Sequence, residues 1–227
     1  MPLFSTLDLS ALACFIGAWI IYALVLESSA YGKRGLNAQM NRYRYLWMEQ
    51  LLARDVRIID TQIVAALQNG NAFFASTSLI AVGGSLTLLH STDAVLSVIG
   101  ALPFGFPTTA AQWQAKTMGL AIIFVYAFFK FAWSYRLFNY VAIMVGATPP
   151  PEQKDTAEAK RHIERAGRLS DVAGQHFNRG QRAFFFALGY LGWFISPWLL
   201  MVTSVAVALV LWRRQFASDS RRAVTGL

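Results

Sequence analysis

Charged residues and cysteine are both scarce in this 227-residue sequence. Asp, Glu, Lys and Arg make up 14% of it, about half the share with which an ordinary soluble domain covers its surface. Hydrophobic residues make up 56%, which excludes a disordered chain. Cys14 is the only cysteine, so a scaffold of intramolecular disulfides is excluded as well. The composition therefore predicts an all-α, polytopic helical membrane protein.

The residue patterns of common catalytic and cofactor sites are also missing. His90, His162 and His176 are scattered, and none has the His-x-x-x-His or Glu-x-x-His spacing of a metal site. The sequence contains no glycine-rich phosphate loop and no Gly-x-Ser-x-Gly nucleophile motif. We therefore predict that the protein is not an enzyme and has no catalytic residue, cofactor or metal.

Four apolar stretches are long enough to cross a bilayer, which takes roughly 20 residues of helix. They predict transmembrane helices at about 9–26, 72–89, 117–138 and 188–212, within one membrane domain of residues 1–227. The second follows a helix breaker at 69–71, and its small residues (76–78, 83–85) suit either close helix packing or a pore wall. The last two stretches stay helix-compatible over 117–146 and 183–212, which is longer than the hydrocarbon core requires. Either these helices tilt strongly or one end of each protrudes from the membrane.

Lys and Arg are concentrated in two segments, 28–70 and 147–182, and are absent from 1–7 and 90–115. Because cytoplasmic loops retain positive charge, we expect the amino terminus outside and both basic segments in the cytoplasm. The formal net charge of +8 then reflects this topology and attraction to anionic lipids, with no nucleic acid needed as a partner. Residues 36–67 predict an additional cytoplasmic amphipathic helix layer, and the apolar loop 94–107 should lie in the membrane interface.

The carboxyl-terminal tail conflicts with a count of four spans, because its four arginines would then lie outside: Arg213, Arg214, Arg221 and Arg222. A pair of helices hinged at Ser196 and Pro197 would return the tail to the cytoplasm. Each arm of such a pair would have only about 15 residues, too few to cross fully. The sequence therefore favours one span kinked at Pro197, with the re-entrant pair as the alternative.

Polar residues near the cytoplasmic ends of the spans form the candidate functional surface. Lys130 interrupts an apolar run, so it either faces a pathway or extends its amine to the headgroups. Asp60 has Arg57 as a helical partner at i,i+3, which leaves Arg54 to pair elsewhere. We expect the following residues to converge as a polar cluster or pathway: Arg54, Asp55, Asp60, Lys130, Ser134, Arg136, Asn139, His176, Asn178 and Arg179.

Three blocks of sequence together resemble a known family. They are residues 40–44 with 47–48 and 54–58, residues 128–134 with 139–140, and residues 176–180 leading into 182–184. These blocks are similar to the bacterial branch of the domain-of-unknown-function 599 family, a group of multi-pass membrane proteins. The resemblance implies a multi-pass protein of the bacterial inner membrane, and it brings no activity, cofactor or catalytic residue.

These observations favour a non-enzymatic membrane subunit that assembles with itself, as a homo-oligomer, or with a membrane-protein partner. Small-residue and aromatic helix faces would supply the contact. The alternative is an anion-handling channel or transporter, with Lys130, Ser134 and Arg136 along the pathway. A third hypothesis is a membrane enzyme that acts on an anionic lipid through Arg54, His176 and Arg179.

Overall fold

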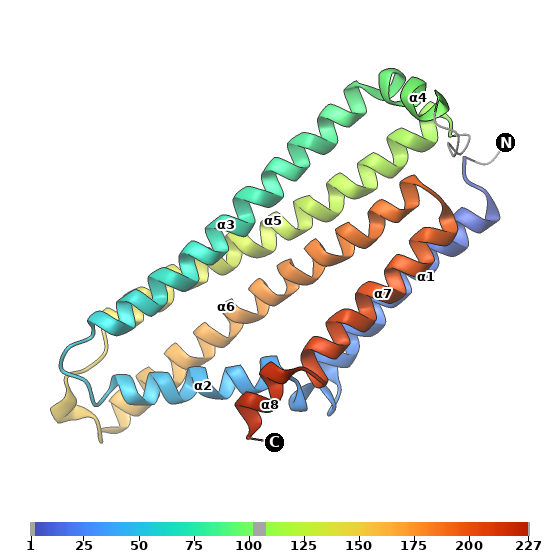
Figure 1. Ribbon diagram of the computed structural model, residues 1–227. Coiled ribbons are helices and arrows are strands. Elements are labelled where there is room, and N and C mark those ends of the chain that lie inside the picture. The colour runs from blue at the N-terminus through green and yellow to red at the C-terminus, as the bar shows by residue number, and fades with distance from the viewer. Residues whose placement is uncertain (1–2, 102–107, 227) are drawn as a thin grey trace. The chain divides into compact units, whose positions relative to one another are not determined.

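The computed structural model describes residues 3–101 and 108–226, and every regular element in these residues is helical (Figure 1). In chain order the elements are α1 (Thr6–Ser28), η1 (Gly32–Arg34), α2 (Leu36–Leu51), α3 (Ile58–His90), α4 (Thr92–Ala101), α5 (Ala110–Gly146), η2 (Pro151–Gln153), α6 (Ala157–Tyr190), η3 (Leu191–Phe194), α7 (Pro197–Phe216) and α8 (Asp219–Thr225). Within these described residues, four helical segments are long and apolar enough to cross a membrane: α1, α3, α5 and Pro197–Thr225. The predicted all-α, polytopic membrane fold is confirmed.

Helix α1 encloses the first predicted span and begins with a reciprocal cap. The backbone N–H of Asp8 donates to the Ser5 hydroxyl at 3.1 Å, and the backbone N–H of Ser5 donates to the Asp8 carboxylate at 3.2 Å. Two N–H groups that a helix start leaves without partners are thereby satisfied.

The helices that follow α1 begin and end at other residues than predicted. The helix expected over 36–67 is interrupted at 52–57, and α3 then runs unbroken through the predicted breaker at 69–71. Asn71 is accommodated inside the helix: it is buried, and its side-chain amide donates to the Leu67 carbonyl one turn earlier at 2.8 Å. The expected loop at 94–107 begins as helix α4, and its residues 102–107 lie outside the described residues.

The single kinked span expected over 183–212 is wrong, because the chain turns back at this point. Helix α6 ends at Tyr190, and α7 starts at Pro197 with Ser196 as its cap. The Thr203 hydroxyl of α7 donates to the Gly189 carbonyl of α6 at 2.7 Å. Further along, the Arg214 guanidinium lies 5.5 Å from the centre of the Phe185 ring. The two helices therefore form an antiparallel pair hinged at Ser196 and Pro197, as the alternative predicted.

Local chemistry explains the turn. Proline is well suited to the first position of a helix, where its missing N–H costs nothing. Gly192 permits the close approach, because a Cβ at this position would lie 2.8 Å from the Thr203 hydroxyl and 3.0 Å from the Leu199 carbonyl oxygen. Helix α6 extends well before residue 183, because it begins at Ala157. Its first part is polar, so α6 is not one of the four membrane-capable segments.

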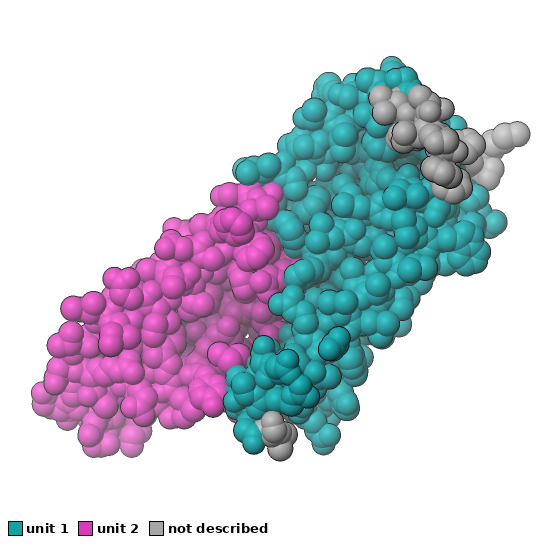
Figure 2. Space-filling view, in the orientation of Figure 1, with its two compact units in different colours: residues 1–36, 78–126, 182–227 teal, residues 37–77, 127–181 magenta. Residues whose placement is uncertain are grey.

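The chain divides into two compact units (Figure 2). Unit 1 comprises residues 1–36, 78–126 and 182–227, and unit 2 comprises residues 37–77 and 127–181. Helices α3, α5 and α6 contribute residues to both units. The polar first part of α6 belongs to unit 2, and its apolar end belongs to unit 1.

Unit 1 has an aromatic centre between α1 and α6. The Trp19 ring stacks on Phe186 with centroids 5.2 Å apart, and Phe15 meets Tyr190 edge-on at 5.3 Å. Helix α5 comes close to this centre at Gly119, where an added Cβ would overlap the Tyr190 hydroxyl. Helix α7 packs along α1.

The two ends of unit 1 can be told apart by their contacts. Asp8 at the start of α1 meets Trp193 of η3 at one end. At the other end, Tyr31 beyond α1 stacks on Trp212 near the end of α7, with centroids 5.6 Å apart. Helices α1 and α7 therefore run in the same direction, and the arginine-rich tail lies at the end of unit 1 that also holds Arg34.

Unit 2 has an aliphatic core built by α2, α3, α5 and α6. Its buried members are Met48, Leu51, Leu52, Val64, Leu137, Phe138, Val141, Val145, Ala159, Ile163, Ala166 and Ala173. All ten predicted site residues belong to this unit.

Candidate functional site

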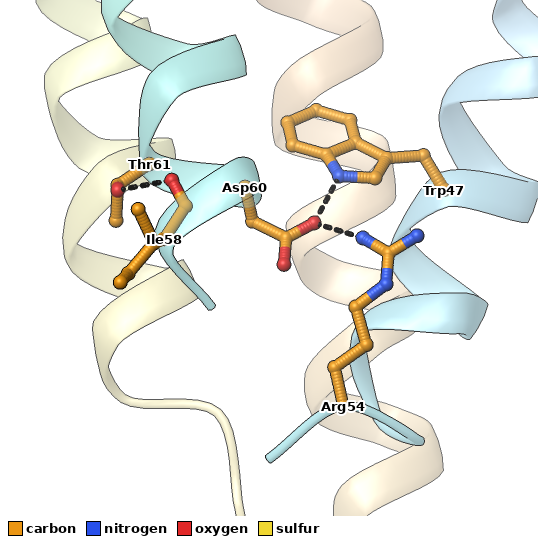
Figure 3. Close-up of polar contacts among 5 residues, drawn as sticks. All are labelled: Trp47, Arg54, Ile58, Asp60 and Thr61. Carbon is orange, nitrogen blue, oxygen red and sulfur yellow. Dashed lines mark hydrogen bonds and ion pairs between the residues drawn. The ribbon is translucent and has the colours of Figure 1, made fainter. Parts of the chain in front are cut away.

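Asp60 is a fully buried carboxylate in the first turn of α3 (Figure 3). Its Oδ1 accepts a hydrogen bond from Trp47 Nε1 at 2.7 Å and forms an ion pair with Arg54. The predicted pairing with Arg57 is wrong, because the turn at 52–57 directs Arg54 back toward the carboxylate. Asp60 thus ties the start of α3 to α2 and to the turn that follows it.

Arg57 instead binds the segment that follows α5. Its two terminal nitrogens donate to the carbonyl oxygens of Thr148 and Pro149 at 2.7 and 2.6 Å. From α6, Nε2 of His162 lies 2.9 Å from the Met144 carbonyl oxygen. Met144 is one of the last four residues of α5, whose carbonyls have no partner within the helix, so His162 supplies one. Arg57 satisfies two carbonyls of the segment that follows α5.

Three predicted site residues of α5 make local contacts within unit 2. The buried Ser134 hydroxyl donates to the Ala173 carbonyl of α6 at 2.7 Å, and Asn139 accepts from Gln68 of α3 at 2.5 Å. Arg136 is exposed, and its Nε donates to the Tyr140 hydroxyl one turn later at 2.8 Å. The first two contacts join helices, so they support packing and lend no support to an anion pathway.

The other predicted site residues differ in exposure. Asp55 is exposed in the turn before α3, and Lys130 of α5 is half-buried. On α6, His176, Asn178 and Arg179 are half-buried, and the His176 ring lies edge-on to Trp133 with centroids 6.5 Å apart. Among the ten residues, the structure joins Arg54 and Asp60 directly.

Arg44 is a residue of unit 2 that the sequence analysis did not single out, although it lies in one of the family-like blocks. Its guanidinium packs over Gly174 of α6, where an added Cβ would lie 2.6 Å from Arg44 Cζ. Burial lowers the pKa of Arg44 from its usual value, and the nearby Asp171 opposes that shift. Glycine at this position of α6 leaves the space that the Arg44 guanidinium occupies.

A second buried charged group, in unit 1, was also missed. Asp8 Oδ1 accepts from Trp193 Nε1 at 2.8 Å, while Lys116 Nζ donates to the Trp193 carbonyl at 2.8 Å and lies 5.3 Å from the centre of its ring. Asp8 is 9% exposed and Lys116 is 7% exposed. The sequence signal that could have found this contact is a carboxylate, Asp8, near the start of one span and a lysine, Lys116, near the start of another. Together these side chains hold the α6–α7 turn against α1 and α5.

Near the other end of unit 1, Arg182 of α6 forms an ion pair with Glu27 of α1. Its side chain is 8% exposed, and its guanidinium lies 6.0 Å from the centre of the Tyr22 ring. This cation marks the point along α6 at which the polar sequence gives way to the apolar one.

Helix α3 contrasts with α5 in how little of it is covered. In the most apolar window of each helix, 11% of α3 residues and 44% of α5 residues are buried. Gly83 and Gly84 are exposed, and a Cβ added at either would meet no atom within 4 Å. With Ile80 and Thr87 they share one exposed helix face, which we call the α3 face (residues 80, 83, 84 and 87).

A cavity of about 480 Å³ in unit 2 has lining residues of both charges. They are Tyr45, Glu49, Leu52, Ala53, Lys154, Asp155, Lys160, Ile163 and Glu164. Because this lining contains three carboxylates and only two lysines, it does not carry the positive charge that an anion site needs. Among the described residues, no group of three or more His, Cys, Asp or Glu could hold a metal ion.

Comparison with known proteins identifies a family. The model of the family described as "Protein of unknown function, DUF599" matches residues 10–220. No curated protein and no solved structure matches the chain.

Proposed function

Since the chain belongs to the DUF599 family, whose function is unknown, we propose its role from its own structure: a non-enzymatic membrane protein that self-assembles through the α3 face. The observation that carries this proposal is the exposure of Gly83 and Gly84 on a membrane-capable helix.

Small residues in a membrane helix are useful where another backbone approaches closely, because lipid tails pack equally well against larger side chains. Two other glycines of unit 1 follow this rule: Gly119 lies under Tyr190, and Gly192 faces Thr203. Gly17 of α1 also has open space around it, but it is half-buried, whereas Gly83 and Gly84 are exposed. Gly83 and Gly84 have no such neighbour among the residues that the structure describes. We therefore assign them a partner helix from outside it.

A second copy of the same helix is the occupant that we propose. Two copies of the α3 face can meet about a two-fold axis with the glycines at the crossing point, since such an interface uses the same surface on both subunits. Ile80 is 75% exposed and would pack beside the crossing. Thr87, whose hydroxyl already bonds to the Gly83 carbonyl at 3.1 Å, would present its methyl group to the partner.

We propose that the protein lies in the bacterial inner membrane and that its amino terminus is outside. Its support is the uneven distribution of charge between the two ends of unit 1. Residues 1–7 and 90–115 contain no Lys or Arg, whereas the end near Trp212 holds Lys33, Arg34 and the arginines of the tail. Cytoplasmic segments are the ones that retain positive charge.

The test compares two glycine substitutions in vesicles by energy transfer between donor-labelled and acceptor-labelled copies. Gly83→Leu is expected to weaken self-association about 10-fold or more, the effect of a central interface residue. Gly17→Leu is the matched control, because Gly17 of α1 also has open space around it. Equal association of both variants, or a monomeric parent protein, would refute the proposal.

A cross-linking experiment tests the same interface by proximity. In a Cys14→Ala background, Ile80→Cys is expected to form an intermolecular disulfide under oxidation. Leu209→Cys on α7, which is also well exposed, is expected not to. A cross-link at 209 and none at 80 would move the interface to α7, against the proposal.

A further inference from the structure

The arginine-rich tail, to which the sequence analysis assigned no function, is built into a corner of unit 1. We call residues 29–35 and 212–226 the basic corner. The chain turns sharply after α1 at Gly32, where an added Cβ would collide with the Leu26 carbonyl. Arg221 of α8 then holds the two segments together, because its Nε donates to the Arg34 carbonyl at 3.1 Å and its Nη1 to the Phe216 carbonyl at 3.2 Å.

The basic corner carries far more positive than negative side-chain charge. Its cations are Lys33, Arg34, Arg213, Arg214, Arg221 and Arg222, and its one carboxylate is Asp219. Asp219 forms an ion pair with Arg222. Lys33, Arg34 and Arg213 are exposed, and they form no ion pair with any residue that the structure describes. Three cations are therefore available to an anion from outside the chain.

Aromatic side chains lie directly beside these cations. Tyr31 stacks on Trp212, and Trp212 meets Phe216 with centroids 4.5 Å apart. Tyr31 is 51% exposed and Trp212 is 37% exposed. Tyrosine and tryptophan are enriched at the depth of lipid headgroups because their rings have an apolar body and a polar edge.

The surface of α7 that leads to the corner is apolar. Val202, Val205, Leu209 and Val210 are all exposed along this membrane-capable helix. A ligand that fits both surfaces has an anionic head for the arginines and long apolar chains for α7. A free anion would use the first surface and leave the second uncovered.

We propose that the basic corner is a binding site for the phosphate headgroup of an anionic phospholipid, whose acyl chains lie along α7. Arginine and lysine side chains at a membrane surface attract such headgroups, and arginine can bind phosphate oxygens with two parallel N–H donors. The site does not depend on the α3 face, so it holds whether or not the protein self-assembles.

The experiment titrates the full-length protein in mild detergent with phosphatidylglycerol and, separately, with phosphatidylcholine of the same acyl chains. Native mass spectrometry counts the bound lipids. We expect a preference for phosphatidylglycerol, which the triple variant Lys33→Gln, Arg34→Gln, Arg213→Gln lowers by about 100-fold, at about 5-fold for each charge. Among the described residues, these three side chains take part in no hydrogen bond or ion pair. The pair Arg34→Lys and Arg213→Lys keeps the charges and is expected to bind nearly as the parent does.

The matched control removes three exposed cations of α6 instead: Lys160→Gln, Arg161→Gln and Arg165→Gln. The affinity of this variant for phosphatidylglycerol is expected to stay within about 3-fold of that of the parent. A loss of that size is allowed because the variant has a smaller positive net charge. Equal losses in the two triple variants, or equal binding of the two lipids by the parent, would overturn the proposal. Displacement of the lipid by millimolar inorganic phosphate would overturn it as well, because the acyl chains would then contribute nothing.

Discussion

At the scale of single residues, Asp60 shows how this protein keeps a charge in its interior. A buried carboxylate is costly unless it is paired and hydrogen-bonded, and Asp60 has both Arg54 and the Trp47 indole as partners. Because Arg54 is 37% exposed, water screens part of the attraction.

Asp60→Asn is expected to lower the free energy of unfolding by roughly 2 kcal/mol, because it removes the charge that Arg54 neutralises and keeps the acceptor for Trp47. Asp55→Asn, five residues earlier and exposed, is expected to change it by less than about 0.5 kcal/mol. Chemical denaturation in detergent micelles measures both. A similar loss from the two variants would show that the Asp60 ion pair stabilises nothing.

Trp193 offers a second test at this scale, in unit 1. Trp193→Phe keeps a ring but removes the N–H that Asp8 accepts, and Asp8→Asn removes the charge from the same bond. A hydrogen bond to a charged group contributes roughly 1.5–3 kcal/mol, so the two variants should be coupled by about that amount in a double-mutant cycle. Additive losses would mean that the hydrogen bond is dispensable.

The contacts of Asp60 and Asp8 also show which residue pairings can be predicted from the sequence and which cannot. It was foreseeable that Asp60 needs a cation, but Arg54 and Arg57 are both near it in sequence. The turn at 52–57 decides between them, and no local pattern specifies that turn. Asp8 and Lys116 were missed because they are 108 positions apart and meet through Trp193, a contact that depends on the tertiary fold.

At the scale of helices, the close approach of α5 to α6 depends on Gly119. Gly119→Ala is expected to lower the free energy of unfolding by about 1–3 kcal/mol, because the new methyl group overlaps the Tyr190 hydroxyl. Tyr190→Phe removes that oxygen and should restore most of the loss in the double variant. Gly17→Ala, where no atom is near, is the control and should not destabilise the protein. Thermal unfolding in detergent distinguishes these cases, and an absence of rescue would place the strain elsewhere.

Helix prediction succeeded where hydropathy alone decides the outcome and failed where polar residues extend a helix. The first three spans lie within α1, α3 and α5, because each contains an apolar run of nearly the required length. The α6–α7 pair was not favoured because the apolar part of α6 is short. Its first part, from Ala157, is polar yet continues the same helix. The expected break at 69–71 was also wrong, because Asn71 is buried within α3 and the helix continues through it.

At the scale of the whole chain, the hairpin at Pro197 brings the arginine-rich tail to the end of unit 1 that holds Tyr31 and Arg34. With α6 leading into η3 at the end of unit 1 where Asp8 lies, α7 returns the tail to the opposite end. The arginines of α7 and α8 then lie with Lys33 and Arg34, as the distribution of positive charge requires for a cytoplasmic end. The fold class was predictable from composition, whereas the direction of the tail required the structure.

The most direct test of this account measures on which side of the membrane the two ends of unit 1 lie. Single cysteines are introduced at Asp93 and at Ser220, both exposed, in a Cys14→Ala background in bacterial cells with a permeabilised outer membrane. A membrane-impermeant maleimide should label Asp93→Cys in intact cells, and should label Ser220→Cys only after the inner membrane is opened. Labelling of both positions from the same side, or of Ser220→Cys alone in intact cells, would contradict the account.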